Sequence, residues 1–411
     1  MSDIEIRPVT EAEFGNFTAA ISEGFSSDLR EVIAERDRRA FPVERTLAAF
    51  DGATIVGTFG GLDLTLTVPG EQQIAIEGTT IVTVFPTHRR MGLLRSMMDQ
   101  HLELAYQRGD ALAGLWSSSS DIYGRFGYGI ATHSRSLAIE GSQIIFRDSV
   151  AVERVRRVSP ETVESEIRDV YGRVALRTPG MFARDDLIWR DHVLADDEWK
   201  REGSTTHRFV VHDGPKGVDG YAIYRQKASE SNDGHPNGTV SIVEVIAESA
   251  VGRASLWAYL TRIDGCPNVR VGNAPLVDPL SAMVTQPRRV AVTAVYDALW
   301  IRVLDVATAL STRRYETDGS LVFEVLDSFR PESAGIYRLT VEGGIGTCGR
   351  SDADANADLR IDVEALGALY LGGGNANHLA DAGRVVGSAE ALRTLHRMFH
   401  TDEQPWCNWV F

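Results

Sequence analysis

The segment Ile81–Leu94 constrains the fold of this chain more than any other. It reads IVTVFPTHRRMGLL, in which a β-branched run leads through a short basic turn into an apolar repeat with helical spacing. We expect a strand over residues 79–84 and a helix over residues 90–108. Thr87 can cap that helix and Gly109 can end it. A strand that turns directly into a helix is typical of mixed α/β folds, so the segment predicts such a domain here.

The start of the expected helix has the chemistry of a phosphate site. Backbone N–H groups in a first helical turn are unpaired and carry the positive end of the helix dipole, so they bind anions well. Gly92 lets a phosphate approach the backbone closely, because it has no side chain. Arg89 and Arg90 add charge-assisted donors. An arginine-rich helix start is often only a solvated cap, and the flanking strand and helix favour the phosphate site.

Length and composition indicate a globular protein of several domains. The chain has 411 residues, enough for about two to four domains. Hydrophobic residues make up 43% and charged residues 24%, as in ordinary globular proteins. The apolar runs are too short for a membrane span, and the start, MSDIEIRPVTEAEF, has no apolar signal core. We therefore expect a cytoplasmic protein without a membrane partner.

Charge and cysteine content narrow the possible partners. The chain has 42 basic and 57 acidic residues, a net charge of −15. This charge repels nucleic acid and attracts a cationic substrate such as an amine. The three cysteines, Cys266, Cys348 and Cys407, are too widely spaced for a disulfide framework or a zinc site, so we expect no metal.

Three regions follow one another along the chain. The first, about 1–148, contains a strand pair, 46–57 and 59–68, around an Asp-Gly turn. The second, about 149–292, repeats the order of strand, loop and helix, which suggests a duplicated fold. The third, about 293–411, has an expected helix around 303–313, then strands at 320–325, 335–341 and 357–363, and it ends in PWCNWVF. Chain ends are normally polar and frayed, so this aromatic end predicts docking against protein.

Several motifs resemble one known family. The turn Arg89–Leu94 resembles the pyrophosphate-binding signature of the GNAT acetyltransferases, Arg/Gln-x-x-Gly-x-Gly/Ala, with Leu as the final residue. Together with LTVPGE (Leu66–Glu71) and IYGRFGYGIAT (Ile122–Thr132), it resembles the Eis (enhanced intracellular survival) family of bacterial acetyltransferases. The third region carries further similar segments: LWIRVLDV (Leu299–Val306), ALGALYLGG (Ala365–Gly373) and the terminal Phe411.

This resemblance implies a mixed α/β (α+β) protein of three domains. They are a catalytic GNAT domain at 1–148, a second, degenerate GNAT-like domain at 149–292, and a sterol-carrier-protein-like domain at 293–411. It also implies transfer of acetyl from acetyl-CoA, without a metal, to amines of aminoglycoside-like or lysine- and polyamine-like acceptors. Such acceptors are small molecules or peptides. The family resemblance further implies a homo-hexamer.

The resemblance assigns roles to particular residues. Tyr123 is implied as the general acid toward the departing thiolate, and the terminal carboxylate of Phe411 as the general base. These two roles are chemically consistent, because the amine must lose a proton and the departing thiolate must gain one. Phe25 and Asp28 are candidates for the acceptor rim. The expected acetyl-CoA contacts are Val82, Val84, Arg89, Arg90, Gly92, Leu93 and Ser118.

Plainer interpretations stand beside these roles. Tyr123 can be read as a core tyrosine beside Tyr128, and Phe411 as a docked apolar end; the resemblance favours catalysis for both. A non-catalytic ligand-sensing protein that keeps these folds is the alternative function. A second alternative, a double-GNAT aminoacyl or peptide-modifying transferase, is disfavoured because the second region lacks an equivalent turn. The second region has only Gly252-Arg253 as a partial counterpart of the turn, so we expect no acetyl-CoA to bind in that region.

Two departures from the family leave the acceptor open. Relatives often carry Ser-Glu-Gly-Gly where this chain has Ser118-Ser119-Ser120-Asp121. The penultimate residue, acidic in the best-known members, is Val410 here. Both changes remove negative charge near the expected acceptor, so the motifs predict an amine but not which amine.

Overall fold

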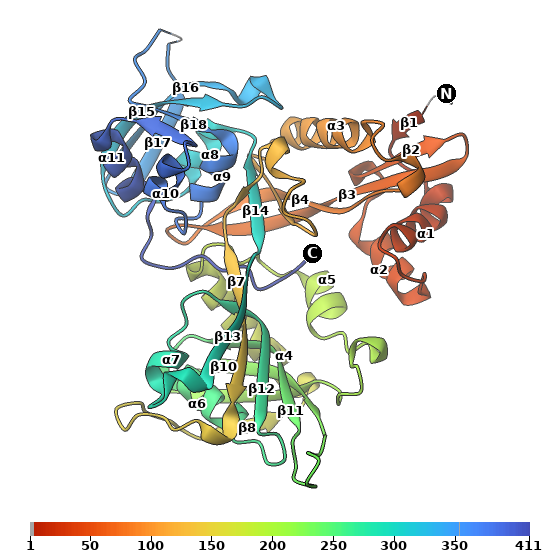
Figure 1. Cartoon of the computed structure of the whole chain (residues 1–411), viewed down its shortest axis with the longest axis vertical. Helices are drawn as coiled ribbons and strands as arrows, with labels where there is room; N and C mark the ends of the chain where they lie inside the picture. Colours follow the sequence, from red (N-terminus) through yellow and green to blue (C-terminus); the bar gives the residue numbers. More distant parts are fainter. Residues whose placement is uncertain (1–3, 353) are drawn as a thin grey trace. The chain divides into compact units, whose positions relative to one another are not determined.

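The computed structural model describes residues 4–352 and 354–411, which form two compact units (Figure 1). The first unit comprises residues 4–132, Ala298–Asp402 and Val410–Phe411. The second comprises His133–Asp297 and Glu403–Trp409. The chain therefore leaves the first unit after its N-terminal part, builds the second, and returns.

A seven-stranded sheet in the order β1-β2-β3-β4-β5-β14-β6 lies at the centre of the first unit (Figure 1). Its strands are β1 (Ile4–Arg7), β2 (Thr46–Asp51), β3 (Thr54–Val68), β4 (Gln72–Val84), β5 (Leu112–Trp116), β6 (Gly129–Ile130) and β14 (Leu299–Val303). The helices here are α1 (Phe14–Gly24), α2 (Glu31–Ala40) and α3 (Leu93–Arg108). The predicted strand pair is present, but its second strand begins at Thr54, because Asp51 pairs with Thr54 across a tight turn.

Alternation along β2 explains how helices cover both faces of this sheet. Leu47 and Ala49 belong to the core cluster that contains the buried face of α3. Ala48 and Phe50 belong to the cluster of the α1 side. Because successive strand residues point to opposite faces, the apolar residues of β2 pack alternately into two different cores. The first sheet is therefore buried between layers, as in α/β folds.

The strand β14 comes from far along the chain. It pairs antiparallel with β5 and with β6, so residues of the LWIRVLDV segment complete the first sheet. The sheet boundaries consequently differ from the expected domain limits. Sequence reasoning missed this arrangement because pairing between distant strands leaves no local signal.

The rest of the third region forms a five-stranded sheet in the order β17-β16-β15-β18-β19. Its strands are β15 (Gly319–Leu326), β16 (Gly335–Glu342), β17 (Ile345–Arg350), β18 (Leu359–Asp362) and β19 (Val385–Gly387). Its helices are α8 (Val306–Thr312), α9 (Val363–Leu369), α10 (Ala376–Asp381) and α11 (Ala389–Phe399). The strands expected at 320–325, 335–341 and 357–363 correspond to β15, β16 and β18.

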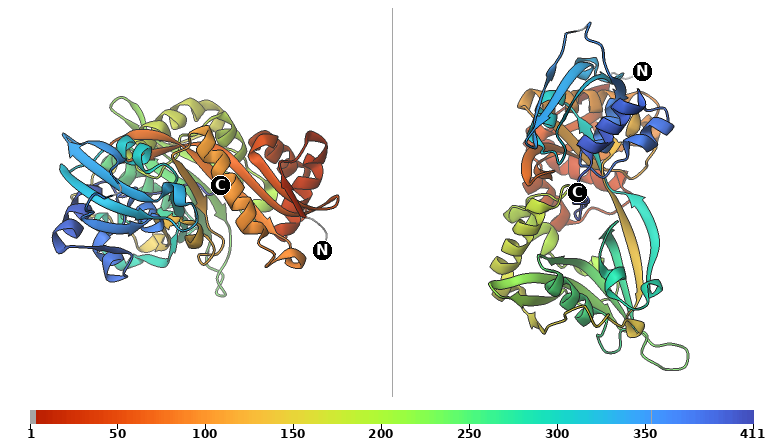
Figure 2. Two further views of the ribbon diagram at one scale, coloured as in Figure 1. Left: turned by 90° about the horizontal axis from the view of Figure 1, so that it is seen from above. Right: turned by 90° about the vertical axis from the view of Figure 1, so that its left-hand side faces the viewer.

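The second unit has a seven-stranded sheet of its own, in the order β13-β7-β12-β11-β10-β9-β8. The strands are β7 (His133–Glu140), β8 (Val155–Val158), β9 (Arg208–Gly214), β10 (Gly217–Lys227), β11 (Thr239–Ala247), β12 (Asn268–Pro275) and β13 (Val290–Asp297). The helices are α4 (Pro160–Arg177), α5 (Asp186–Ile188), α6 (Ala250–Leu260) and α7 (Leu280–Met283). Helix α4 lies against this sheet (Figure 2). Strand β7 lies within the residue limits expected for the first domain, 1–148, and pairs with β12 of the second unit.

The aromatic chain end docks, as predicted. The side chains of Pro405, Cys407 and Trp409 are buried within the second unit. Among the described residues, no helix has both the length and the apolar character needed to cross a bilayer.

Candidate active site

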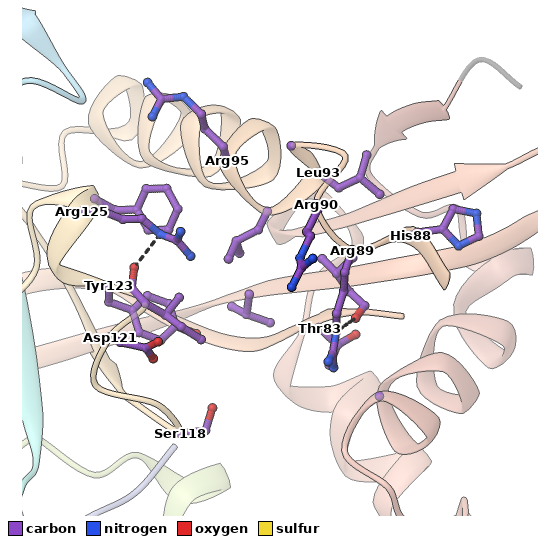
Figure 3. Close-up of a pocket in the computed structure, with 17 residues that line it drawn as sticks. Thr83, His88, Arg89, Arg90, Leu93, Arg95, Ser118, Asp121, Tyr123 and Arg125 are labelled. Carbon is purple, nitrogen blue, oxygen red and sulfur yellow. Dashed lines mark hydrogen bonds between the residues drawn. The ribbon is translucent and has the colours of Figure 1, made fainter. Parts of the chain in front are cut away.

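A cavity of about 770 Å³ opens in the first unit beside the end of β4 (Figure 3). β4 and β5 run parallel and pair at Glu77 and Gly78, and β4 then continues beyond this ladder to Val84. Three segments surround the cavity: the end of β4, the turn into α3 and the loop after β5. The lining residues are Gly24, Val82, Thr83, Val84, His88, Arg89, Arg90, Gly92, Leu93, Leu94, Arg95, Ser118, Asp121, Ile122, Tyr123, Arg125 and Phe126.

A bulge bends β4 just before the cavity. The register with β3 shifts between Thr58 and Gly60, and Ile81 adopts a φ of 48°. A positive φ is rare for a β-branched residue and needs support from its surroundings. The Thr58 hydroxyl donates to the Ile81 carbonyl at 2.7 Å and lies 2.8 Å from the Thr83 hydroxyl. The bulge thus re-aims the following residues, Val82 and Val84, toward the cavity rim.

The basic turn forms a concave stretch of backbone. Arg90 and Gly92 have φ values of 65° and 84°, and Gly92 is the N-cap of α3. Residues in left-handed conformation near a helix start direct successive N–H groups into an anion-binding concavity. A Cβ on Gly92 would meet no atom within 4 Å, so this position needs glycine for its backbone conformation and not for space. Thr87, expected as the cap, instead bonds the His88 ring at 2.8 Å.

Four arginines line the cavity, two of which the sequence did not single out. Arg89 and Arg90 are exposed on the turn, and Arg89 Nε donates to the Val84 carbonyl at 3.3 Å. Arg125 lies with Tyr123 across the opening from them (Figure 3). Arg95 stands on the first turn of α3. The cavity is therefore strongly cationic, which suits a ligand with several phosphates.

Aromatic rings hold the two additional arginines. The Arg95 guanidinium lies 4.8 Å from the Phe329 ring centre, and the Arg125 guanidinium lies 5.2 Å from that of Phe126. The two rings meet edge to face at 5.0 Å. Phe329 comes from the third region, so Arg95 is positioned by a residue whose role no local motif reveals.

Tyr123 is the buried phenol of this cavity. Its side chain is 6% exposed, and burial raises its pKa to about 12. The phenol is therefore protonated near neutral pH and able to donate a hydrogen bond. Tyr128, interpreted as structural, is fully buried and bonds the Thr79 hydroxyl at 2.9 Å. Of the two tyrosines in the motif, only Tyr123 is among the cavity residues.

The loop that carries Tyr123 is held from the third region. The buried Arg302 of β14 donates to the Phe126 carbonyl and pairs with Asp327 at 2.5 Å. A Cβ on Gly129 would lie 1.9 Å from the Glu364 carbonyl oxygen of α9. Glycine is therefore required where the motif passes α9. The glycine-rich motif and the third region form one packed assembly.

Another residue missed from the sequence adds negative charge to this loop. Asp121 lines the cavity and accepts a hydrogen bond from the Ser119 hydroxyl at 2.6 Å. This hydrogen bond lowers the pKa of Asp121 below its usual value, so the group is a carboxylate at neutral pH. From the sequence, Asp121 was considered only as part of the segment Ser118–Asp121 that departs from the relatives.

The predicted donor-site residues lie together at the cavity, and the predicted acceptor and base residues are not among the residues that line it. All seven expected acetyl-CoA contacts and Tyr123 border the cavity. Phe25 and Asp28 are exposed and follow Gly24, which does border it. Phe411 belongs to the same unit as the cavity but is not among its lining residues.

Comparison with known proteins identifies each region. Residues 5–131 match a model described as an acetyltransferase (GNAT) domain, and residues 180–303 match a second GNAT domain model. Residues 306–408 match a sterol carrier protein domain. An uncharacterized N-acetyltransferase from Streptomyces avermitilis is 34% identical over 100% of this chain and 99% of its own. N-acetyltransferase Eis from Mycobacterium tuberculosis is 32% identical over 87% of this chain and 89% of its own.

The chain belongs to the Eis family of GNAT acetyltransferases. The crystal structure of Eis1 from Mycobacterium abscessus matches with a TM-score of 0.84 and 29% identity over 100% of both chains. A GCN5-related N-acetyltransferase from Anabaena variabilis shares the fold, with a TM-score of 0.85 and 17% identity over both full chains. The protein is an N-acetyltransferase with two GNAT domains and a sterol-carrier domain. GNAT acetyltransferases use acetyl-CoA as the donor.

The second GNAT domain of this Eis-family chain differs at the place that corresponds to the phosphate turn. Helix α6 follows β11 as α3 follows β4, and Ser249 is its N-cap. The Ser249 hydroxyl donates to the Asp219 carboxylate at 2.7 Å, and His212 Nδ1 lies 2.6 Å from the same group. A carboxylate from the chain itself thus occupies the helix start, where it would repel a phosphate.

Proposed function

We propose that this protein transfers acetyl from acetyl-CoA directly to a primary amine of an aminoglycoside-like or lysine- or polyamine-like acceptor. One observation carries the proposal: the same cavity is bordered by the concave basic turn, the bulged end of β4 and the protonated phenol of Tyr123. These are the parts that a phosphate-bearing thioester donor needs. The repelling carboxylate in the second GNAT domain limits donor binding to the first.

The donor-binding roles follow from the geometry of the turn. Arg89, Arg90 and the N–H groups from Gly92 to Leu93 bind the pyrophosphate. Backbone groups of Val82 and Val84 pair with the pantetheine arm, because β4 extends past its ladder with β5. Ser118 contributes a hydroxyl at the opposite rim.

The proposed chemistry balances with two proton transfers. The neutral amine attacks the thioester carbonyl carbon, and the C–S bond breaks with its electron pair on sulfur. Tyr123 donates a proton to the departing thiolate, and the terminal carboxylate of Phe411 accepts the proton that the amine loses. A free α-carboxyl has a pKa of about 3.5, so it is ionised at neutral pH and available as the acceptor.

Charge favours a cationic acceptor. The net charge of −15 attracts polyamines and aminoglycosides over a distance. Within the cavity, the Asp121 carboxylate can pair with a second ammonium of the same acceptor. Phe25 and Asp28 form the outer rim. We place the reaction in the cytoplasm, with no nucleic-acid or membrane partner.

The decisive experiment is a thiol-release assay with acetyl-CoA against a panel of amines. We expect turnover with polyamine-like or aminoglycoside-like acceptors. Deleting Phe411 moves the carboxylate by up to ~3.5 Å and should lower kcat by about 10²-fold. Phe411→Leu keeps the carboxylate and should cost much less. Tight acetyl-CoA binding without thiol release for any amine would instead support the ligand-sensing alternative.

We also propose a homo-hexamer, on the family resemblance alone; a closed hexamer would agree with the closed symmetry that is the norm for homo-oligomers. Light scattering at micromolar concentration should report about six chains per particle. A monomer under these conditions would contradict the proposed assembly.

A further inference from the structure

The basic residues of this chain are very unevenly divided between two types. Of the 42 basic residues only three are lysines, Lys200, Lys216 and Lys227, and the other 39 are arginines. Lysine is among the commonest residues of ordinary proteins, so three in 411 residues is few. All three are exposed and belong to the second unit. The segments of the first unit, which contains the cavity, have no lysine in their sequence.

The cavity itself takes its positive charge from arginine. Arg89, Arg90, Arg95 and Arg125 line it, and among the described residues no lysine does. Lysine is also a common phosphate-binding residue, because its ammonium acts as a compact point charge. Phosphate binding alone therefore does not require arginine at all four positions. Another property of arginine must distinguish the two side chains in this cavity.

That property is reactivity toward a thioester. A lysine ammonium exchanges with a neutral amine that has a lone pair, and such an amine is the acceptor of the proposed reaction. An arginine guanidinium keeps its proton in proteins and has no acceptor atom. Arginine thus supplies charge to the cavity without supplying an amine that the bound donor could acetylate.

A lysine in the lining would compete strongly with any free acceptor. Groups held in one site react as though highly concentrated, with effective molarities of about 10⁵–10⁸ M when they are well oriented. A poorly oriented side chain that keeps a small part of this advantage still exceeds a free substrate at about 1 mM. The resulting acetyl-lysine is a stable amide without charge. One such event would remove a cation from the donor site for good.

We propose that the cavity arginines, and Arg125 in particular, are specificity-determining residues that prevent the enzyme from acetylating itself. This inference rests on the proposed transfer of acetyl to an amine. Arg125 lies with Tyr123, the proposed proton donor to the thiolate, on one side of the cavity (Figure 3). Its Nε donates to the Ile122 carbonyl at 3.0 Å, and its guanidinium lies 5.2 Å from the Phe126 ring centre. The cation nearest in sequence to the proposed acid is therefore held in place and cannot act as an acceptor.

Replacing Arg125 by lysine should convert this protection into self-modification. In Arg125→Lys the neutral amine attacks the thioester carbonyl carbon of bound acetyl-CoA, and an amide bond forms. The C–S bond breaks with its electron pair on sulfur, Tyr123 protonates the thiolate, and the amine loses its proton to solvent. Coenzyme A is released once per chain without any added acceptor.

The test is intact-protein mass spectrometry with acetyl-CoA and no added amine, followed by peptide mapping. Arg125→Lys should gain one acetyl group at position 125, at least ~10²-fold faster than Lys216 of the same molecules is acetylated. Asp121→Lys, which brings an amine into the same lining with all four arginines retained, should also be modified. Arg338→Lys on the exposed side of β16 is the matched control, and position 338 should react no faster than Lys216.

The outcomes separate this inference from the proposed function. If the unaltered protein acetylates added amines while Arg125→Lys and Asp121→Lys both stay unmodified, the arginines are only a compositional preference and self-protection is overturned. Equally fast modification at position 338 would overturn it as well. If no amine is acetylated and neither variant is modified, the proposed function fails and takes the inference with it. Selective acetylation at position 125 or 121 supports both.

Discussion

At the scale of single residues, strained and buried groups gather around the cavity. Ile81 keeps its unusual φ because Thr58 satisfies the carbonyl that the bulge displaces. Tyr123 keeps its proton because burial disfavours the phenolate. The strained backbone at Ile81 costs stability locally and is maintained by surrounding packing. Such costs concentrate where a chain must present groups to a ligand.

Tyr123→Phe should lower kcat by ~10²- to 10⁴-fold, because the departing thiolate loses its proton donor. The affinity for acetyl-CoA should change little, since the ring remains. Steady-state kinetics and calorimetry measure the two quantities. Tyr128→Phe is the matched control: it removes the bond to Thr79 and should cost about 0.5–1.5 kcal/mol of stability with kcat retained. Equal loss of kcat in both variants would contradict the assignment.

The pKa of Tyr123 also predicts a pH profile. An ordinary tyrosine acting as an acid would lose its proton near pH 10, and activity would fall above that pH. Burial raises the pKa of Tyr123 to about 12, so the acid stays protonated as pH rises through 10. We expect kcat to hold a plateau from about pH 8 to about pH 11, which is about one unit below that pKa. A decline centred near pH 9 would show that another acid is used.

At the scale of elements, two helices that begin after equivalent strands have opposite chemistry. Helix α3 starts with exposed arginines and a left-handed glycine. Helix α6 starts with Ser249 bonded to the Asp219 carboxylate. The first start attracts an anion, and the second already has one from its own chain. The two helix starts of the duplicated fold therefore favour ligands of different charge.

Calorimetry should detect one acetyl-CoA per chain. Arg90→Ala should weaken this binding by about 1–3 kcal/mol, the scale of losing one charge-assisted contact. Arg253→Ala alters the only partial counterpart of the turn in the second domain and should leave acetyl-CoA binding unchanged. Two equal sites per chain would contradict the role assigned to Asp219.

The elements also indicate how far the sequence could predict the site. The strand, turn and helix around Gly92 were predictable, because turn chemistry and apolar spacing are local properties. The family resemblance predicted Tyr123 as the general acid. The motif alone could not distinguish this tyrosine from one that only packs in the core. Arg95 was missed because its partner, Phe329, lies 234 positions later in the chain, and only tertiary packing joins them. Local signals thus predicted the basic turn at the cavity but not the residues that support it.

At the scale of the whole molecule, the regions are less separable than their sequence suggests. Apolar spacing predicted strands at 320–325, 335–341 and 357–363, which correspond to β15, β16 and β18. It predicted neither β7 nor β14, and each of these strands pairs with a strand outside the residue limits expected for its domain. Arg302 of β14 then holds the loop of Tyr123. The catalytic domain consequently depends on residues near position 300.

This dependence predicts how truncations behave. A fragment ending at residue 148 lacks β14 and leaves the edge of β5 unpaired, so it should aggregate and bind no acetyl-CoA. A fusion of residues 1–132 to residues 298–402 restores the strand and should recover donor binding. Solubility and calorimetry compare the two. Full donor binding by the shorter fragment would show that β14 is dispensable.

The pairing of β5 with β14 has a consequence for biosynthesis. The ribosome completes β5 about 180 residues before it reaches β14. At ~5–20 residues per second, the nascent chain waits roughly 9 to 36 s with that strand edge open. Meanwhile residues 133–297, the larger part of the second unit, emerge from the ribosome. The enzyme should therefore acquire a working cavity only late in translation, and its newly made N-terminal part is the stage most exposed to aggregation or to chaperone capture.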